Sequence, residues 1–221
     1  MPSLRQALAT YINHDAEADE LDNIQANKEI VWTENLLKSI EWKLFEDLCM
    51  EFLRIKNCDA KVTSTGADGG IDIKITDRNG IVFAIAQCKA WSKPVGVKPI
   101  RELYGIMAGE RIKLGLFLTT SGFSEDARNF ADGKSLILID SREMVEAINQ
   151  LAPNGRAKLD GLIRQNDYQT PTCVNCNTKM VKRTAKTGPN AGNAFWGCVN
   201  FPRCKNTMKV RKQSDASSTH Q

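Results

Sequence analysis

Residues 65–91 read TGADGGIDIKITDRNGIVFAIAQCKAW, and the rest of the chain is organised around this stretch. Two β-rich runs, 71–76 and 81–89, flank an Asn79-Gly80 pair. Asn-Gly between alternating hydrophobic residues is a strong hairpin signal, because both residues tolerate the positive φ of a type I′ turn. The stretch therefore predicts two antiparallel strands joined by a tight turn.

A two-residue loop fixes the register of this hairpin. Arg78 then pairs with Ile81, and counting back along the ladder places Asp72 directly opposite Gln87. Directly opposed residues share one face of a sheet, and Lys89 follows on that face by the period of two. We therefore expect a carboxylate, an amide and an ammonium to converge at the open end of the hairpin.

Other loop lengths change this prediction in different ways. A four-residue loop over 77–80 places Asp72 opposite Ile85 and still keeps the three side chains on one face. A three-residue loop turns Gln87 to the other face unless a β-bulge intervenes. An ordinary amphipathic hairpin with a solvated aspartate and lysine is the alternative interpretation.

The three side chains suit phosphodiester chemistry. Asp72 and the amide oxygen of Gln87 are hard ligands of the kind that Mg²⁺ takes together with waters and phosphate oxygens. Lys89 would orient or deprotonate a metal-bound water and counter the charge that grows on the phosphate. The hairpin thus predicts a magnesium-dependent hydrolytic site.

Glu46 is a candidate from a second element. Apolar residues at a spacing of three to four predict one helix over 36–57, and Glu46 lies off its apolar stripe. Its helical neighbours are Trp42, Met50 and Leu53, so it is an acid among large apolar groups, which favours a role in pairing or catalysis over simple solvation.

The remaining part of residues 1–151 predicts an α/β domain. A strand over 114–119, a helix capped by Ser124 and a strand over 135–139 form a βαβ unit, so these two strands should be parallel. Asp140 and Glu143 form a predicted capping box for a helix over 141–151. The other expected elements are a strand over 61–65, a glycine-rich turn with Asp68 and a helix over 99–112. The fold class is a mixed β-sheet flanked by helices on both faces.

With these residues, the region from about 40 to 151 resembles the Mrr-type restriction endonuclease domain of the PD-(D/E)xK nuclease superfamily. The resemblance rests on Phe45-Glu46 and on five later blocks. They are TGADGGIDI, QCK, IRELYGIM, LFLTTSGFSEDARNFA and ILID, in that order. It implies a restriction-endonuclease-like fold and metal-dependent DNA hydrolysis that leaves 5′-phosphate and 3′-hydroxyl ends. It makes Asp72 the metal-binding aspartate, Gln87 the second ligand, Lys89 the catalytic lysine and Glu46 a further acid at the site. It also implies modified, foreign or damaged DNA as the substrate.

Four late cysteines form a separate pattern. Cys173 and Cys176 make one closely spaced pair, and Cys198 and Cys204 make another after twenty-one intervening residues. Two such pairs in a chain without a secretion signal point to tetrahedral Zn²⁺ held by four thiolates, with disulfides as the alternative. A segment this small has little core, so we expect the metal to supply most of its folding free energy.

The segment 173–207 closely resembles the C-terminal zinc ribbon of bacterial type I topoisomerases, which implies DNA binding, often to single strands. Lysine and arginine side chains would contact phosphates, and aromatic side chains would either stack on bases or form the small core. The DNA-binding candidates are Lys182, Arg183, Lys186, Trp196, Arg203 and Lys205, with Phe195 and Phe201 as further aromatic residues.

Charge and composition fit a DNA-binding protein of two parts. Residues 1–151 hold 18 Lys/Arg and 23 Asp/Glu, a net −5, whereas residues 152–221 hold 12 and 3, a net +9. A basic C-terminal third favours a polyanionic partner. No apolar run approaches the roughly 18 residues of a membrane span, and we expect a cytoplasmic protein.

The expected organisation has five parts, and three functions remain open. The parts are an N-terminal arm or helical extension (1–35), the nuclease domain (36–151), a linker with room for one short helix (152–170), the zinc ribbon (171–212) and a disordered tail (213–221). The favoured function is a Mg²⁺-dependent DNA endonuclease assisted by the ribbon, with a homodimer on the substrate. A non-catalytic DNA-binding adaptor and an enzyme acting on RNA are the alternatives.

Overall fold

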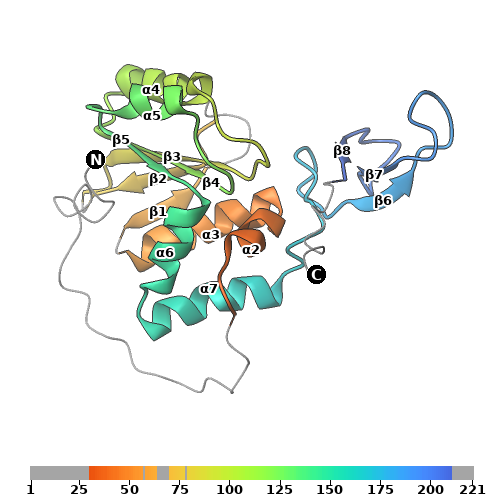
Figure 1. Ribbon diagram of the computed structural model, residues 1–221, viewed down its shortest axis with the longest axis horizontal. Coiled ribbons are helices and arrows are strands. Elements are labelled where there is room, and N and C mark those ends of the chain that lie inside the picture. Colours follow the sequence, from red (N-terminus) through yellow and green to blue (C-terminus); the bar gives the residue numbers. More distant parts are fainter. Residues whose placement is uncertain (1–29, 57, 64–69, 78, 211–221) are drawn as a thin grey trace, which may run out of the picture. The chain divides into compact units, whose positions relative to one another are not determined.

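The computed structural model describes residues 30–56, 58–63, 70–77 and 79–210. The chain forms two compact units, residues 1–169 and residues 170–221. The first unit is built on one five-stranded mixed sheet in the order β1-β2-β3-β4-β5 (Figure 1). These strands are β1 (Asp59–Val62), β2 (Ile73–Thr76), β3 (Val82–Lys89), β4 (Leu114–Thr119) and β5 (Leu136–Ile139). The β1–β2 and β2–β3 pairs are antiparallel, whereas the β3–β4 and β4–β5 pairs are parallel.

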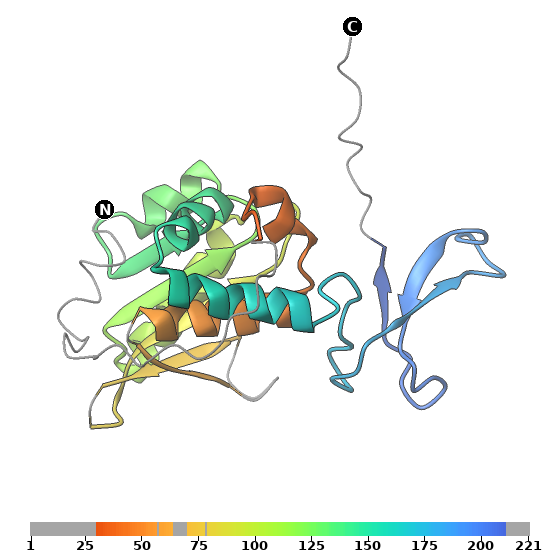
Figure 2. The ribbon, with the colours of Figure 1, turned by 90° about the horizontal axis from the view of Figure 1, so that it is seen from below.

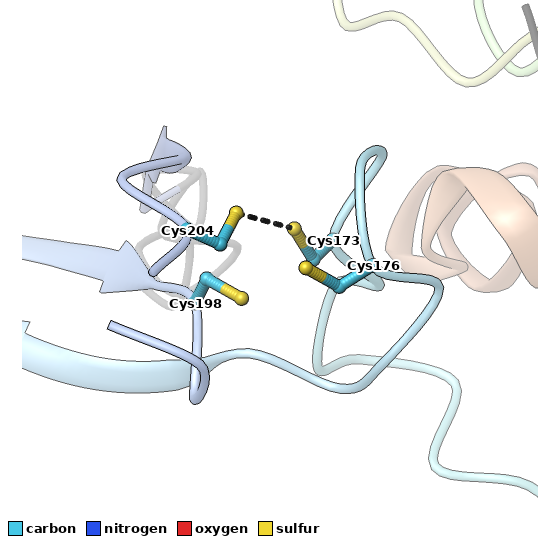
Figure 3. A group of neighbouring side chains, drawn as sticks. All are labelled: Cys173, Cys176, Cys198 and Cys204. Atoms are coloured by element: carbon cyan, nitrogen blue, oxygen red, sulfur yellow. Dashed lines mark hydrogen bonds between the residues drawn. The ribbon is translucent and has the colours of Figure 1, made fainter. Parts of the chain in front are cut away.

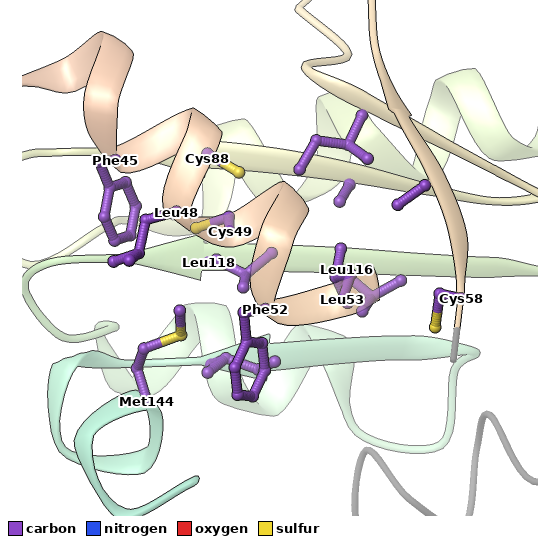
Figure 4. Packing of buried hydrophobic residues seen from close by; sticks show 14 of the residues in the cluster. Phe45, Leu48, Cys49, Phe52, Leu53, Cys58, Cys88, Leu116, Leu118 and Met144 are labelled. Atoms are coloured by element: carbon purple, nitrogen blue, oxygen red, sulfur yellow. The ribbon is translucent and has the colours of Figure 1, made fainter. Parts of the chain in front are cut away.

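Helices cover both faces of this sheet, as the sequence predicts for an α/β domain (Figure 1). One face carries α4 (Val97–Glu110) and α5 (Glu125–Ala131), and the other carries four further helices of the described residues. These are α2 (Glu34–Ser39), α3 (Trp42–Ile55), α6 (Ser141–Asn149) and α7 (Pro153–Gln165). Each face has its own cluster of buried apolar residues, because the side chains of β3 alternate between them. Figure 4 shows how α3 packs Phe45, Leu48 and Phe52 into the larger cluster.

The βαβ unit is present where the sequence places it. Strand β4 has the predicted bounds, it is buried at every position, and β5 lies parallel to it. The Ser124 side chain accepts the N–H of Ala127 at the start of α5. Asp140 and Glu143 form both hydrogen bonds of the capping box at the start of α6. The capping residues in the sequence therefore predicted the starts of α5 and α6 correctly.

The turn of the β2–β3 hairpin differs from the predicted type I′ turn. The N–H of Asp77 donates to the carbonyl of Ile81 at 2.9 Å, so three residues, not two, separate the paired positions. Gly80 has a positive φ of 75°, whereas Asn79 does not. The Asp77 carboxylate closes the loop instead, accepting the N–H groups of Asn79 and Ile81 at 2.9 Å each. Arg78 and its predicted pairing lie outside the described residues.

A β-bulge compensates for the longer loop. Thr76 pairs with Val82 but Ile75 pairs with Ala84, so one extra residue is accommodated in β3. The final pair of the ladder is then Ile73 with Ala86. This is the same register that a two-residue loop without a bulge would give, and Asp72 and Gln87 follow this last pair on their two strands.

The predicted first helix is two helices. Leu37 and Ile40 are fully buried, as the apolar stripe requires, but the backbone of Ile40 is extended and ends α2. Glu41 then caps α3, its carboxylate accepting the N–H groups of Lys43 and Leu44. Glutamate is an uncommon N-cap residue. The apolar spacing therefore continues from α2 into α3 without a capping residue that would have predicted the break.

A second difference from the predicted structure concerns the segment expected as a linker, most of which is helical and belongs to the first unit. Residues 153–165 form helix α7, which packs beside α3 in the first unit (Figures 1 and 2). Pro153 suits the first turn of a helix, and Gly155 allows close packing because a Cβ there would lie 2.8 Å from the Ile55 side chain. Leu159 and Ile163, one turn apart, enter the larger apolar cluster. The Pro-Asn-Gly sequence therefore starts a packed helix rather than a linker.

The second unit is a three-stranded antiparallel sheet in the order β6-β7-β8. Its strands are β6 (Val181–Thr184), β7 (Ala194–Gly197) and β8 (Thr207–Lys209). Most of the predicted N-terminal arm, the turn with Asp68 and the C-terminal tail lie outside the described residues. Among the helices of the described part of the chain, none combines the length and the apolar character that a membrane span requires.

Candidate functional site

Asp72 and Lys89 meet at the end of the β2–β3 hairpin, as the sequence predicts. The Nζ atom of Lys89 lies 3.5 Å from Oδ2 of Asp72, and both side chains are largely buried. The same Oδ2 atom accepts the backbone N–H of Cys88 at 2.7 Å. Asp72 itself is held by its own N–H, which donates to the carbonyl of Ala86 at 3.0 Å. The backbone of β3 therefore fixes the carboxylate beside the lysine.

Gln87 lies against the glycine turn that leads into Asp72. It is buried, and a Cβ added at Gly70 would lie 2.9 Å from its Nε2 atom. Gly70 also has a φ of +97°, which side-chain-bearing residues rarely adopt. The glycine thus makes room for the Gln87 side chain two residues before Asp72, next to the predicted site.

Glu46 approaches the same centre from α3. Its side chain is 13% exposed, and burial raises the pKa of its carboxyl from 4.5 to about 7. The negative charge of Asp72 is the second cause of this rise, and the positive charges of Lys43 and Lys89 oppose it. The structure therefore brings Glu46 into the electrostatic neighbourhood of Asp72 and Lys89.

Lys43 is a site residue that the sequence reasoning did not single out. Its Nζ atom lies 3.4 Å from Oε2 of Glu46 and 3.1 Å from Oδ1 of Asp47. It is also close enough to lower the pKa of Asp72. The spacing of three and four residues along one helix was the available signal, since lysines at such spacing pair with acids.

Burial dominates the proton affinity of the two carboxyl groups at this centre. Burial raises the pKa of Asp72 and outweighs the opposing effects of Lys89, of the Cys88 N–H and of Lys43. Both Asp72 and Glu46 thus hold protons more tightly than ordinary carboxyls, even beside two ammonium groups. Two carboxyl groups and an amide oxygen at a partly buried site are the oxygen donors that a divalent ion prefers. The residues fit Mg²⁺ chemically.

The four late cysteines converge in the second unit. Their sulfur atoms all lie within 4.8 Å of one another, and Figure 3 shows them directed at a common centre. Cys173 and Cys204 are 3.8 Å apart, which is the separation of about 3.8 Å expected in a tetrahedron with Zn–S bonds of about 2.3 Å. The predicted thiolate set, which also contains Cys176 and Cys198, therefore fits Zn²⁺.

Hydrogen bonds stabilise the anionic form of the Cys173 sulfur, whereas burial and the neighbouring thiols raise the pKa of Cys198 to about 11. Burial raises the pKa of Cys173, but N–H donors from Asn206, Asn175 and Cys176 outweigh it and lower the pKa to about 6. The side chain of Asn206 lies 3.4 Å from this sulfur. Such outer donors orient the ligands of a metal and stabilise the anionic form.

The predicted DNA-binding residues of the ribbon occupy different environments. Trp196 is half-buried and packs on the cysteine cluster, so most of its ring belongs to the small core. Arg183 is also half-buried, with its guanidinium 5.6 Å from the ring centroid of Phe201. Phe201 is the exposed aromatic residue, at 57%. The exposed cationic candidates are Lys182, Lys186, Arg203 and Lys205.

Two family models match the chain. Residues 37–148 match the model Mrr_cat, described as restriction endonuclease, and residues 170–213 match the topoisomerase DNA binding C4 zinc finger. The type IV methyl-directed restriction enzyme EcoKMrr of Escherichia coli (strain K12) is 40% identical over 87 residues. That match covers 38% of this chain, which spans only 28% of the relative's length.

Two solved structures are similar at low identity. The MspJI restriction endonuclease in complex with a 27-mer oligonucleotide is 19% identical, with a TM-score of 0.39, over 57% of this chain and 32% of that chain. The DNA modification-dependent restriction endonuclease AspBHI is 19% identical, with a TM-score of 0.41, over 68% of this chain and 45% of that chain. Since the Mrr_cat match alone spans half of the sequence, the chain belongs to the restriction endonuclease family of the Mrr type and carries a topoisomerase-type four-cysteine zinc ribbon.

Proposed function

We propose that the protein is a Mg²⁺-dependent DNA endonuclease whose zinc ribbon assists DNA binding. The observation that carries the proposal is the meeting of Asp72, Lys89 and Glu46 at the carboxyl end of β3, inside a restriction endonuclease domain. Ligands of α/β sheets bind at this end of the strands, so the cluster lies where a substrate is expected.

Each residue has a distinct task in this proposal. The Asp72 carboxylate and the Gln87 amide oxygen would hold the metal, and Glu46 would complete the oxygen set. A divalent ion supplies Lewis acidity toward the phosphate and lowers the pKa of a bound water. Lys89, already fixed by Asp72, is placed to orient the attacking water and to neutralise charge on the phosphate as the P–O bond breaks.

The substrate proposed first is methylated DNA. The name of the Escherichia coli relative describes a methyl-directed restriction enzyme. The match between the two chains is one of sequence, at 40% identity over 87 residues. The ribbon's exposed lysine and arginine residues support phosphate contacts outside the catalytic centre. We propose that these contacts raise affinity for DNA without selecting a sequence.

Plasmid cleavage tests the proposal. Purified protein is incubated with methylated and unmethylated supercoiled plasmid, with Mg²⁺ or with a chelator. Lys89→Ala should reduce nicking by a factor on the order of 10² to 10³, because it removes charge stabilisation at the phosphate, while gel-shift affinity stays nearly unchanged. Lys61→Ala is the matched control, since Lys61 pairs with Asp59 on β1 and is 69% exposed.

The outcomes separate the enzyme from the adaptor. Metal-dependent nicking that depends on Lys89 supports the enzyme. Binding without cutting, on every plasmid and with Mg²⁺ or Mn²⁺, would instead identify a DNA-binding adaptor that keeps the nuclease fold as a scaffold. Cutting both strands needs two catalytic centres, so we also propose a homodimer on DNA, which light scattering of the protein–DNA complex measures.

A further inference from the structure

Trp91 lies two residues beyond Lys89, and 45% of its surface is exposed. Ala86, Cys88 and Ala90 are all buried in the apolar cluster beneath α3. Because side chains alternate along β3, Gln87 and Lys89 lie on the opposite face, and Trp91 follows two residues after the strand ends at Lys89. The indole therefore follows the proposed catalytic lysine past the carboxyl end of β3.

Three consecutive hydroxyl groups at the end of β4 and just after it hold the backbone of this segment. Residues 119–121 are buried, and each donates a hydrogen bond to an alternate carbonyl. The bonds are Thr119 Oγ1 to Lys89 at 2.8 Å, Thr120 Oγ1 to Trp91 at 3.1 Å and Ser121 Oγ to Lys93 at 2.8 Å. The segment 89–93 is therefore fixed before any substrate arrives.

We propose that Trp91 is a stacking platform for a nucleobase next to the scissile phosphate. The inference rests on the proposed nuclease function and adds a specific base contact to it. A fixed, partly exposed indole gives a large flat surface at a small cost in conformational entropy. Stacking on such a ring tolerates every base, because each base has a π-face.

The charges around Trp91 favour DNA as the occupant. Lys89 precedes Trp91 by two residues and Lys93 follows it by two with an exposed side chain, so two cationic residues flank the indole in the chain. A phosphodiester backbone would satisfy both cations while one of its bases covers the ring. The exposed ring therefore lies in the segment that directly follows the proposed catalytic lysine.

Substitutions that separate ring stacking from apolar contact test the proposal in the full-length protein. DNA affinity is measured with a chelator present, so that no hydrolysis occurs, on a fluorescein-labelled methylated duplex and on the corresponding single strand. Trp91→Ala should weaken binding by about tenfold, the lower part of the range for one stacked base. Trp91→Phe should stay within about threefold of wild type, and Trp91→Leu should behave like Trp91→Ala. Ile81→Ala, at the other end of β3 and 63% exposed in the wild type, is the control and should leave affinity unchanged.

Tryptophan fluorescence supplies an independent readout. The emission of wild type minus that of Trp91→Phe reports Trp91, and it should be quenched when DNA is added. Equal affinity of wild type and Trp91→Leu, or no quenching in the difference signal, overturns the stacking platform while Lys89-dependent cutting still supports the nuclease. Failure of the wild type to cut with any metal refutes the nuclease but leaves the affinity and quenching tests of Trp91 decisive.

Discussion

Glu46→Gln should stabilise the metal-free protein at alkaline pH, although it removes a proposed catalytic group. Burial and Asp72 raise the pKa of the Glu46 carboxyl from 4.5 to about 7, and one pKa unit corresponds to about 1.4 kcal/mol. The full rise thus corresponds to about 3.5 kcal/mol, and we expect about 2 kcal/mol after screening by solvent at the 13% exposed side chain. Glutamine keeps the shape of the side chain and never ionises.

The sign of the effect fixes its pH window. Below about pH 4.5 the carboxyl is protonated in both the folded and the unfolded chain, so the variant and the wild type should be equally stable. Between pH 4.5 and about 7 the unfolded chain releases its proton first, so the wild type loses stability as the pH rises. Above pH 7 the difference should be constant, with Glu46→Gln the more stable protein.

Urea unfolding followed by circular dichroism at 222 nm measures this difference. All helices of the described residues lie between Glu34 and Gln165, so the signal reports the nuclease unit. Glu51→Gln, on the same helix but paired with Arg54, is the control and should stay within about 0.5 kcal/mol of wild type. A Glu46→Gln protein no more stable than wild type at pH 8, or a difference that persists at pH 4, would refute the raised pKa of the buried Glu46 carboxyl.

Three further predictions follow from the same geometry. Lys43→Met should tighten Ca²⁺ binding without DNA by about fivefold in titration calorimetry, because the ammonium that neutralises the centre is gone, whereas Lys38→Met, which removes an exposed helical pair, should not. Gly70→Ala should abolish cutting and lower the melting temperature, since its Cβ would lie 2.9 Å from Nε2 of Gln87; unchanged activity would show that Gln87 can move freely. Cys198→Ser should lower the zinc content measured by mass spectrometry and weaken DNA binding, while the helical signal at 222 nm is retained.

The parts of the fold that the sequence predicted are those fixed by short-range chemistry. Strand β4 is a continuous apolar run between polar residues, and Ser124 and Asp140 cap helices through bonds to residues three positions away. The parts that failed depend on distant partners. The break after Ile40 is coupled to a hydrogen bond from the N–H of Glu41 to the carbonyl of Tyr168, more than a hundred residues on. No local pattern contains that partner.

The same distinction explains the candidate site. Asp72 and Lys89 were found because a hairpin brings them together within one local element, and a bulge preserved their register despite the wrong turn type. Lys43 was missed because its importance depends on Asp72, which belongs to a different element. The sequence allowed only a short helix within a linker where α7 packs, because Gly155 is typical of a loop until the side chain of Ile55 is seen against it.

The charges of the centre link metal binding to DNA binding. With every group ionised, the three carboxylates of Glu46, Asp47 and Asp72 and the two ammonium groups of Lys43 and Lys89 leave one negative charge. A divalent ion alone reverses this to one positive charge, and one phosphodiester group then restores neutrality. Since DNA without the metal would add a second negative charge, each ligand should bind more tightly when the other is present. We therefore expect weak Mg²⁺ binding to the free protein and tight binding to the protein–DNA complex, and equal metal affinity in both states would contradict the charge balance.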